Sequence, residues 1–304
     1  MAKLKNIKIH DSTGDIILNW ITGLILFLLI FVVGYPLVYI ISCSLSSTAA
    51  LESGRVVLLP VEFSTYAYEF VLNYKQVWVG FRNSVFYTIC DVFMQMTMTI
   101  CIAYPISKRY FKPRRFITFL FYFSTRFNAG MIPTFILKCN LGLFDNIWAV
   151  LLGGAIGVSH MLILRTAFNS NVPGDLFDSA MIDGASHLQS LFQLALPLCK
   201  ATLSVLILYC IVGQWNEYFT SMLFLRDQRL YPLQLVLRPI MTATSANATL
   251  DVSQMKPTYQ QQAEQGLEGV RYALIIISST PIVCAYFCVQ RYFKGGVLVG
   301  AVKG

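Results

Sequence analysis

Charged side chains are scarce in this sequence. Only 12% of its 304 residues are Asp, Glu, Lys or Arg, whereas soluble proteins carry about a quarter. Hydrophobic residues make up 56% of the chain, and the mean hydropathy is +0.61. This shortage of solubilising charge excludes an ordinary soluble domain and favours a protein that crosses a membrane several times.

Motifs for catalysis and for energy conversion are also missing. The sequence has no GxxxxGK[ST] phosphate-binding loop, because its nearest glycine cluster, Gly153–His160, lacks the lysine. Its eight cysteines form no CxxC pair and no Cys/His cluster at metal-ligand spacing. We therefore expect the chain itself to be no enzyme and to hold neither cofactor nor metal.

The hydrophobic residues are arranged in six runs, each long enough to cross a bilayer, which takes about 20 residues. The first run has 26 residues, well beyond the roughly 7–15 of a signal-peptide core, so we expect it to be retained. The sequence predicts an all-α membrane protein with six transmembrane helices, at Ile16–Ile41, Phe81–Ile106, Phe116–Leu137, Ile147–Phe168, Ala201–Leu225 and Val270–Val289.

Lysine and arginine set the predicted orientation. They cluster before the first run (Lys3, Lys5, Lys8), after the second (108–115) and in the C-terminal tail. With six crossings these three groups lie on one side, which the positive-inside rule makes the cytoplasm. The net charge of +8 is therefore a topology signal, and no basic soluble domain is present that would bind nucleic acid.

The runs divide the chain into segments. We expect a cytoplasmic N-terminal segment at 1–15, the first transmembrane helix at 16–42, and a cytoplasmic tail at 291–304. Between an extracytoplasmic loop at 43–80 and the tail lies a core domain, 81–290, with five helices. The core domain contains a cytoplasmic loop at 169–200 and an extracytoplasmic loop at 226–269.

The 169–200 loop has the pattern of two short helices. Pro173 suits the first turn of one helix, and Gly184 can end it in a left-handed turn. A second helix places Leu188, Leu191, Phe192 and Ala195 on one apolar stripe, which Pro197 then limits. An interfacial helix resting on lipid would fit the stripe but not the acidic residues Asp175, Asp178 and Asp183.

This loop resembles the cytoplasmic signature of the permease subunits of ATP-binding cassette (ABC) importers. That signature is Glu-Ala-Ala, three residues, Gly, nine residues, a hydrophobic residue, any residue, then Leu-Pro. The chain has Asp178-Ser179-Ala180, then Gly184, then Leu194-Ala195-Leu196-Pro197 at the same spacing. It departs from the family only in Asp for Glu and Ser for the first Ala.

Four further stretches resemble the carbohydrate-uptake permeases. The last of them is similar to a subgroup that imports oligosaccharides, including acidic ones. The stretches are IDGAS at Ile182–Ser186, the run Met131–Leu152, the run Gln214–Arg238, and the tail Gln290–Gly304.

The resemblance implies a multi-pass permease in a bacterial cell membrane, with both termini cytoplasmic. Its partners would be a second, related permease, two ATPase subunits that bind ATP and Mg²⁺, an extracytoplasmic substrate-binding protein, and an oligosaccharide substrate. It also implies that the 169–200 loop docks the ATPase. Gly184 would allow the turn, Asp178 and Asp183 would cap helices or meet basic residues of the ATPase, and Leu194, Leu196 and Pro197 would couple the loop to the fifth helix.

Ionisable groups inside a membrane are costly and are therefore functional candidates. Asp91 and Arg126 fall at similar depth on consecutive runs, and two interpretations are open. They form a buried ion pair, or Arg126 faces a water-filled path, where its planar fork suits a substrate carboxylate. His160, in the fourth run, is expected to be a packing residue.

Trp215, Asn216 and Glu217 lie where sugar permeases often carry Trp-Asn. Their aromatic face, amide and carboxylate suit the apolar faces and hydroxyls of a sugar, and an aromatic anchor at the membrane interface is the alternative. The rival functions are a secondary transporter driven by ions and a membrane enzyme. The transporter would favour an inverted repeat with broken helices, and the sequence shows no such repeat. The enzyme would need a convergent catalytic set in the spans, and Asp91, His160 and Glu217 are too scattered to build one.

Overall fold

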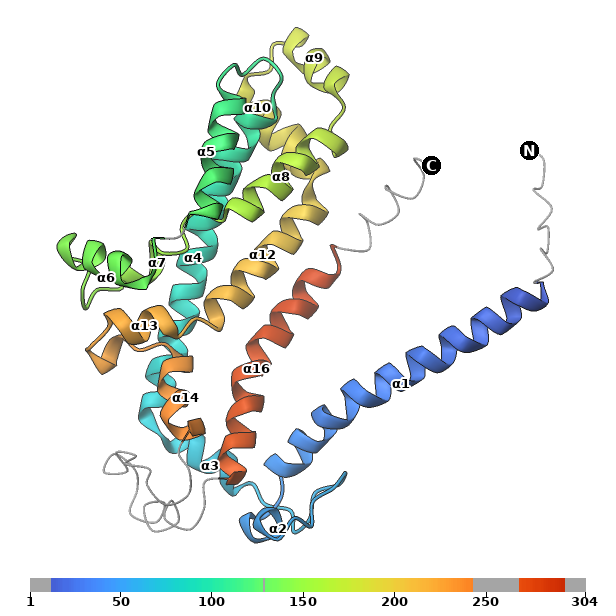
Figure 1. Ribbon diagram of the computed structural model, residues 1–304, viewed down its shortest axis with the longest axis vertical. Coiled ribbons are helices and arrows are strands. Elements are labelled where there is room, and N and C mark those ends of the chain that lie inside the picture. The colour runs from blue at the N-terminus through green and yellow to red at the C-terminus, as the bar shows by residue number, and fades with distance from the viewer. Residues whose placement is uncertain (1–11, 128, 243–267, 293–304) are drawn as a thin grey trace. The chain divides into compact units, whose positions relative to one another are not determined.

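The computed structural model describes residues 12–127, 129–242 and 268–292. All the regular secondary structure in these ranges is helical, as the sequence predicts (Figure 1). The chain packs as two compact units. The described parts of Met1–Val71 and Gln261–Ile276 form the first, and those of Leu72–Gln260 and Ile277–Gly304 form the second.

The first unit is built on the long helix α1. Helix α1 (Thr13–Ser44) begins in a capping box, in which the side chains of Ser12 and Asp15 satisfy free backbone N–H groups of the first turn. A small core of Cys43, Ala50 and Val56 lies at its C-terminal end. The unit also contains α2 (Thr48–Glu52), most of α3 (Tyr66–Asn73) and the first part of α16 (Glu268–Gln290).

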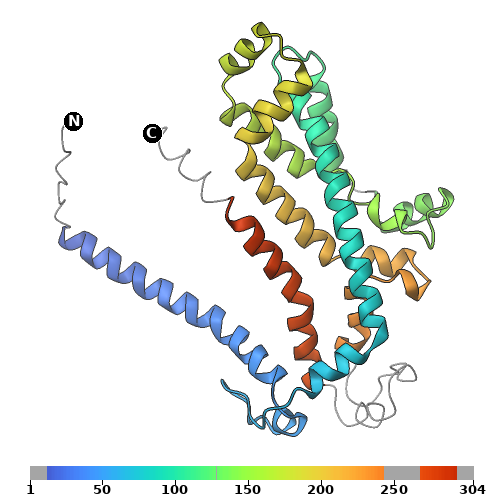
Figure 2. The same ribbon diagram turned by 180° about the vertical axis from the view of Figure 1, so that it is seen from behind.

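The second unit is organised around α4 (Lys75–Ser107), a helix of 33 residues. Helices α8 (Val158–Asn171) and α12 (Lys200–Trp215) pack along it, and α14 (Leu233–Thr242) packs near its beginning, as both ribbon views show (Figures 1 and 2). A hydrophobic core fills the space between α4, α8 and α12 and includes Met161, Leu164 and Leu206.

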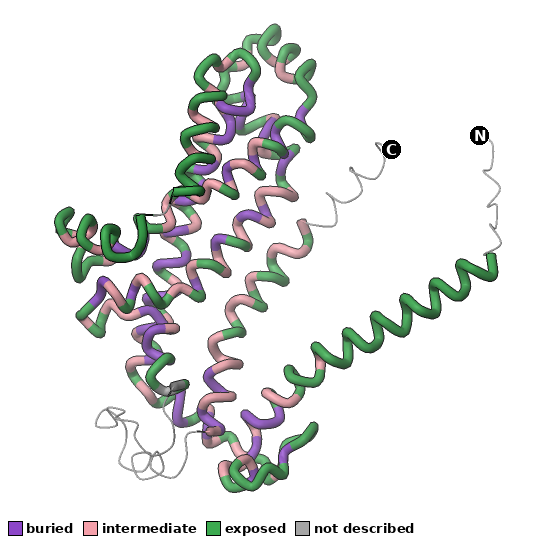
Figure 3. The backbone as a smooth tube through the Cα atoms, viewed as in Figure 1, coloured by how far each residue is buried: buried purple, intermediate pink, exposed green. Residues whose placement is uncertain are grey.

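One face of α4 is both buried and polar, and Figure 3 shows buried segments along this helix. Near its N-terminal end Asn83 Nδ2 donates to the carbonyl oxygens of Arg229 (2.7 Å) and Tyr231 (3.0 Å), and Tyr87 donates to that of Leu230 (2.8 Å). Buried polar groups must find protein partners in a bilayer, because no water is available there. The buried polar residues of the face are Asn83, Ser84, Thr88, Asp91, Gln95, Thr99 and Ser107.

Three of the six predicted runs are interrupted, so the prediction of six continuous helices is wrong for them. The third run is divided into α5 (Arg114–Arg126) and α6 (Met131–Asn140). The fourth is divided into α7 (Trp148–Leu151) and α8. The fifth is divided into α12 and α13 (Phe219–Phe224). Hydropathy identified the apolar runs but not the breaks inside them.

Glycine accounts for two of these breaks. Gly130, before α6, has φ +85°, a left-handed conformation that other residues avoid. Between α7 and α8, a Cβ atom on Gly154 would lie 2.9 Å from Asp91 Oδ1, and one on Gly157 would lie 2.8 Å from His160 Nδ1. Gly154 thus leaves room for the Asp91 carboxylate of α4, and Gly157 leaves room for the His160 ring of α8.

Within the described ranges, α1, α4 and α16 are each long and apolar enough to cross a membrane. A fourth candidate is a bent pair. Its first part comprises α10 (His187–Ser190), a π-helical turn (Leu191–Ala195) and α11 (Leu196–Leu198), and α12 follows at an angle of 83°. The remaining elements are α9 (Gly174–Ile182) and a 3-10 turn (Gln228–Leu230).

Candidate functional site

The 169–200 loop forms a helix–turn–helix whose turn is fully hydrogen-bonded. Gly184 has φ +82°, and its N–H donates to Met181 O at 3.1 Å, while Ala185 N–H donates to Ala180 O at 2.9 Å. These two bonds are those of a Schellman motif, which needs a left-handed residue at this place. The predicted role of Gly184 in the turn is confirmed by this geometry.

The second helix of the loop begins in a capping box. Ser186 N–H donates to Gln189 Oε1 at 2.8 Å, and Gln189 N–H donates to Ser186 Oγ at 3.3 Å. Ser186 is thus the N-cap, and the expectation that Asp178 or Asp183 caps a helix N-terminus is wrong. Asp178 lies inside α9 and Asp183 at its C-terminal end, and both are exposed.

The apolar residues of the loop point in two directions. Leu191 and Ala195 are buried in the core of the second unit, whereas Leu188 and Phe192, predicted on the same stripe, are exposed. The exposed set includes Met181 and Ile182 on α9, and the side chain of Ile182 is 87% exposed. The loop therefore presents hydrophobic side chains beside three exposed carboxylates, Asp175, Asp178 and Asp183.

The end of the signature joins the loop to α12. Leu194 and Leu196 are half-buried, Pro197 is exposed, and Leu196 packs against the core. The chain then bends by 83° at Cys199, whose side chain is fully buried. The first part of the signature is more exposed: Ser179 is exposed and donates to Asp175 O at 2.8 Å, and Ala180 is half-buried.

Asp91 and Arg126 do not form an ion pair, so that interpretation of the two charges is wrong. Asp91 is 3% exposed, and its Oδ1 has no hydrogen-bond partner among the described residues. It lies against the break between α7 and α8, where Gln95 Nε2 donates to Gly154 O at 2.6 Å.

Arg126 is the last residue of α5 and is exposed. Its Nη2 donates to Tyr122 Oη at 2.9 Å, and its guanidinium carbon lies 5.2 Å from the centre of the Tyr122 ring. The rings of Phe119, Phe123 and Phe127 stack along the same helix face, with centroids 5.9 and 4.5 Å apart. This exposed face thus ends in a cation, which no described carboxylate neutralises.

The structure places Trp215, Asn216 and Glu217 at the break between α12 and α13. Trp215 is 3% exposed and donates to Ser278 O at 2.9 Å, and it also lines an apolar cavity of about 430 Å³. Asn216 donates to Val212 O at 2.9 Å, and Glu217 Oε1 accepts from Thr220 N–H at 2.6 Å. Glu217 therefore caps α13.

His160 lies near this region and makes packing contacts. Its ring stacks on that of Tyr209, and its Nδ1 lies 3.7 Å from Cys210 Sγ. These contacts agree with the expected packing role.

The structure adds a group of residues that the sequence did not single out, at the C-terminal end of α4, which the predicted orientation makes its inner end. Tyr104 donates from its hydroxyl to His187 O at 3.1 Å, and Lys108 Nζ lies over the ring of Phe177. Burial lowers the pKa of Lys108 to about 8, and the charge of Asp178 opposes part of this shift. In the sequence, Lys108 belongs to a cluster of basic residues at 108–115, which served only to predict the orientation of the chain.

Comparisons with known proteins agree with these features. No protein-family model matches the chain. It is 34% identical to the protein LplC of Bacillus subtilis over 269 residues, which is 88% of this chain and 89% of that protein. It is 32% identical to YtcP, a polygalacturonan/rhamnogalacturonan transport system permease protein of Bacillus subtilis, over 92% of this chain and 96% of that protein.

A solved structure is similar over nearly the whole chain. It is that of a bacterial ABC transporter involved in the import of the acidic polysaccharide alginate, with a TM-score of 0.82 and 33% identity over 94% of this chain and 99% of that one. The chain is therefore an integral membrane protein of the carbohydrate-uptake family of ABC-importer permeases.

The turn at Gly184 gives a direct test of the loop. We expect Gly184→Leu to strain the left-handed position and to break the Schellman motif, since L-residues other than Asn and Asp rarely adopt it. The ATPase should then co-purify at a fraction of its wild-type amount, while the permease still inserts. Gly174→Leu is the control, because it has open space and no left-handed φ. Normal ATPase recovery and normal uptake with Gly184→Leu would contradict this role.

Proposed function

We propose that this chain is one of two permease subunits that form the path of an ATP-driven importer for acidic oligosaccharides. In this proposal it crosses the membrane six times, three of the crossings are interrupted helices, and both termini are cytoplasmic. Two ATPase subunits bind ATP and Mg²⁺ and dock at the 169–200 loop. An extracytoplasmic binding protein delivers the saccharide.

The observation that carries the docking role is the form of the 169–200 loop. Its turn and both helix ends satisfy their own hydrogen bonds, so the loop holds its shape without a partner. Its outer surface still exposes Met181, Ile182, Leu188 and Phe192, and contiguous exposed apolar side chains mark interaction sites. Asp178 and Asp183 add charge that suits basic residues of an ATPase.

The acidic class of substrate rests on Arg126. Even the insertion scales with the lowest values give a free-energy cost of about 2.5–3.5 kcal/mol for an arginine at the bilayer centre. Asp91 does not offset this cost. Aromatic rings stack on the apolar faces of sugars, and a guanidinium pairs with a carboxylate through two parallel hydrogen bonds. The exposed face of α5 offers both, with three phenylalanines leading to Arg126.

The relatives support the same class. The solved neighbour takes part in the import of an acidic polysaccharide, and YtcP is named for polygalacturonan and rhamnogalacturonan transport. The residues Trp215, Asn216 and Glu217 remain candidates for the path. Arg126 is the stronger candidate for an acidic saccharide, because it is a cation with no carboxylate partner among the described residues, whereas Glu217 is itself an anion.

The source of energy separates this proposal from an ion-driven transporter. We expect uptake by the complete complex in liposomes to require ATP and Mg²⁺ on the side of the membrane where the ATPase subunits lie. Ionophores, which dissipate ion gradients, should not affect this uptake. The reason is that energy reaches this chain only through contact with its ATPase. Uptake driven by an ion gradient without ATP would contradict the importer function.

Substitution of Arg126 tests the substrate class. If Arg126 binds a substrate carboxylate, Arg126→Ala lowers uptake of an acidic oligosaccharide by about 10-fold or more, as the loss of a charge-assisted hydrogen bond of about 1.5–3 kcal/mol implies. Uptake of a neutral analogue and the melting temperature should stay near the wild-type values. Arg126→Lys is the matched control, and it should recover part of the acidic uptake. Equal loss of both sugars with a lower melting temperature would make Arg126 structural.

A further inference from the structure

We propose that Tyr104 and Lys108, at the inner end of α4, are positioning residues that fix both helices of the 169–200 loop to α4. Through them, displacement of the loop by the ATPase becomes movement of α4. This inference rests on the proposed docking role of the loop and deepens it. The two residues touch neither nucleotide nor substrate and act through the loop.

The contact with the first helix is made by Lys108. This lysine is 7% exposed, and its Nζ lies 2.6 Å from the ring centre of Phe177 on α9 and 4.6 Å from that of Tyr104. An ammonium group over a ring face is attracted by the negative face of the ring's quadrupole, and the attraction is stronger where water is excluded. Asp178, the next residue of α9, adds an opposite charge to the same place.

The contact with the second helix is made by Tyr104. Its hydroxyl donates to the carbonyl oxygen of His187, the first residue of α10, at 3.1 Å. Tyr110, three residues after the end of α4, stacks on the His187 ring with the centroids 5.7 Å apart. The Tyr104 ring also packs edge-on against Phe168 of α8, so the hydroxyl is held in place.

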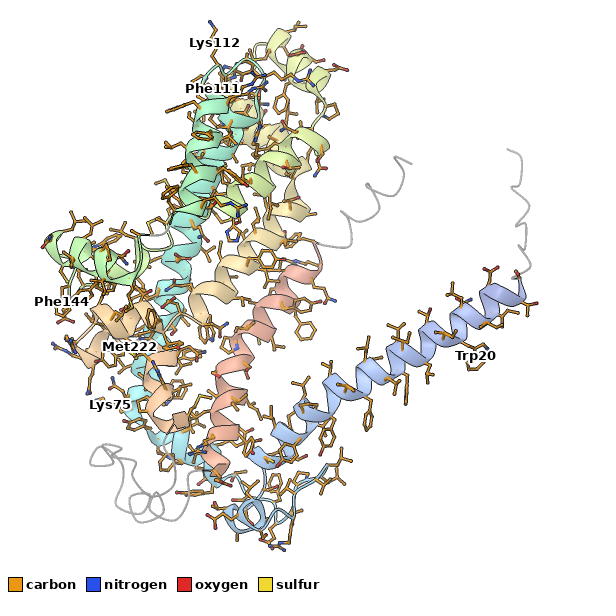
Figure 4. All side chains as sticks on the ribbon, viewed as in Figure 1. Trp20, Lys75, Phe111, Lys112, Phe144 and Met222 are labelled. Carbon is orange, nitrogen blue, oxygen red and sulfur yellow. The ribbon has the colours of Figure 1, made fainter. Side chains whose placement is uncertain are left out.

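These contacts lie on the two sides of the turn at Gly184. Lys108 holds α9 before the turn and Tyr104 holds α10 after it, so neither helix can move far from α4 without breaking one of them. The opposite end of α4 is bound to the 229–233 segment through Asn83, Ser84 and Tyr87. Figure 4 shows Lys75 at that end and Phe111 and Lys112 just past the inner end. One helix therefore connects the loop to the outer side of the second unit.

The number of ATP molecules hydrolysed per saccharide imported reports this link. Tyr104→Phe removes one hydroxyl and keeps the ring. We expect it to raise the ratio by about 2- to 12-fold, the change in equilibrium that one net hydrogen bond provides, with normal ATPase co-purification. Tyr87→Phe is the matched control, because it removes a hydroxyl bond from the same helix at the outer end. It should leave the ratio unchanged, because Asn83 and Ser84 keep that end of α4 bound to the same segment.

Substitution of Lys108 tests the other contact. At pH 7, below its pKa of about 8, Lys108→Ala should raise the ratio, whereas Lys108→Arg should restore most of the coupling, because a guanidinium stacks on rings as well. Lys112 also follows the end of α4, but it is exposed. Lys112→Ala is therefore the control and should behave as wild type.

An unchanged ratio in both Tyr104→Phe and Lys108→Ala would overturn the inference, as would an equal rise in Tyr87→Phe. Loss of the ATPase from the Tyr104→Phe complex would also overturn it, because the hydroxyl would then support the loop's fold rather than its link to α4. Failure of the proposed function is distinguishable, since it would show as ATP-independent uptake by the wild-type complex.

Discussion

A helix inside a bilayer must hydrogen-bond its buried polar side chains to other protein groups, because no water reaches them. Helix α4 carries such side chains along its length, and their partners come from segments far apart in the sequence. Backbone carbonyl oxygens of the 229–231 segment, of Gly154 and of His187 accept bonds from Asn83, Gln95 and Tyr104. These three bonds attach three separate segments of the second unit to one helix, whereas Thr88 Oγ1, Asp91 Oδ1 and Thr99 Oγ1 on the same helix have no hydrogen-bond partner among the described residues.

The same requirement explains the interrupted helices. A regular helix uses its own carbonyl oxygens, so it has few to offer to a neighbour. The break between α7 and α8 frees Gly154 O for Gln95, and its glycines allow the close approach. Irregular backbone at membrane depth is tolerated where protein covers it.

Much of this could be predicted from the sequence. Apolar runs identified the helical membrane class, and the spacing of Gly184 from Asp178 and Pro197 identified the loop and its turn, because turn chemistry is local. The breaks, the separation of Asp91 from Arg126, and the contacts of Tyr104 and Lys108 could not be predicted. They depend on which distant segments contact α4. Hydropathy is a mean over neighbouring residues in the sequence and carries no information on such contacts. The capping role assigned to the aspartates failed because Ser186 competes for the same place.

The central claim is that the 169–200 loop and the inner end of α4 move as one body. Double electron–electron resonance between spin labels at Gly174, which has open space around it at the start of α9, and Lys112 in the complete complex measures this most directly. The account predicts one distance, unchanged when ATP binds, and a second, longer distance in the Tyr104→Phe and Lys108→Ala double variant. A wild-type distance that changes with ATP would show that the loop moves independently of α4 and would contradict the account.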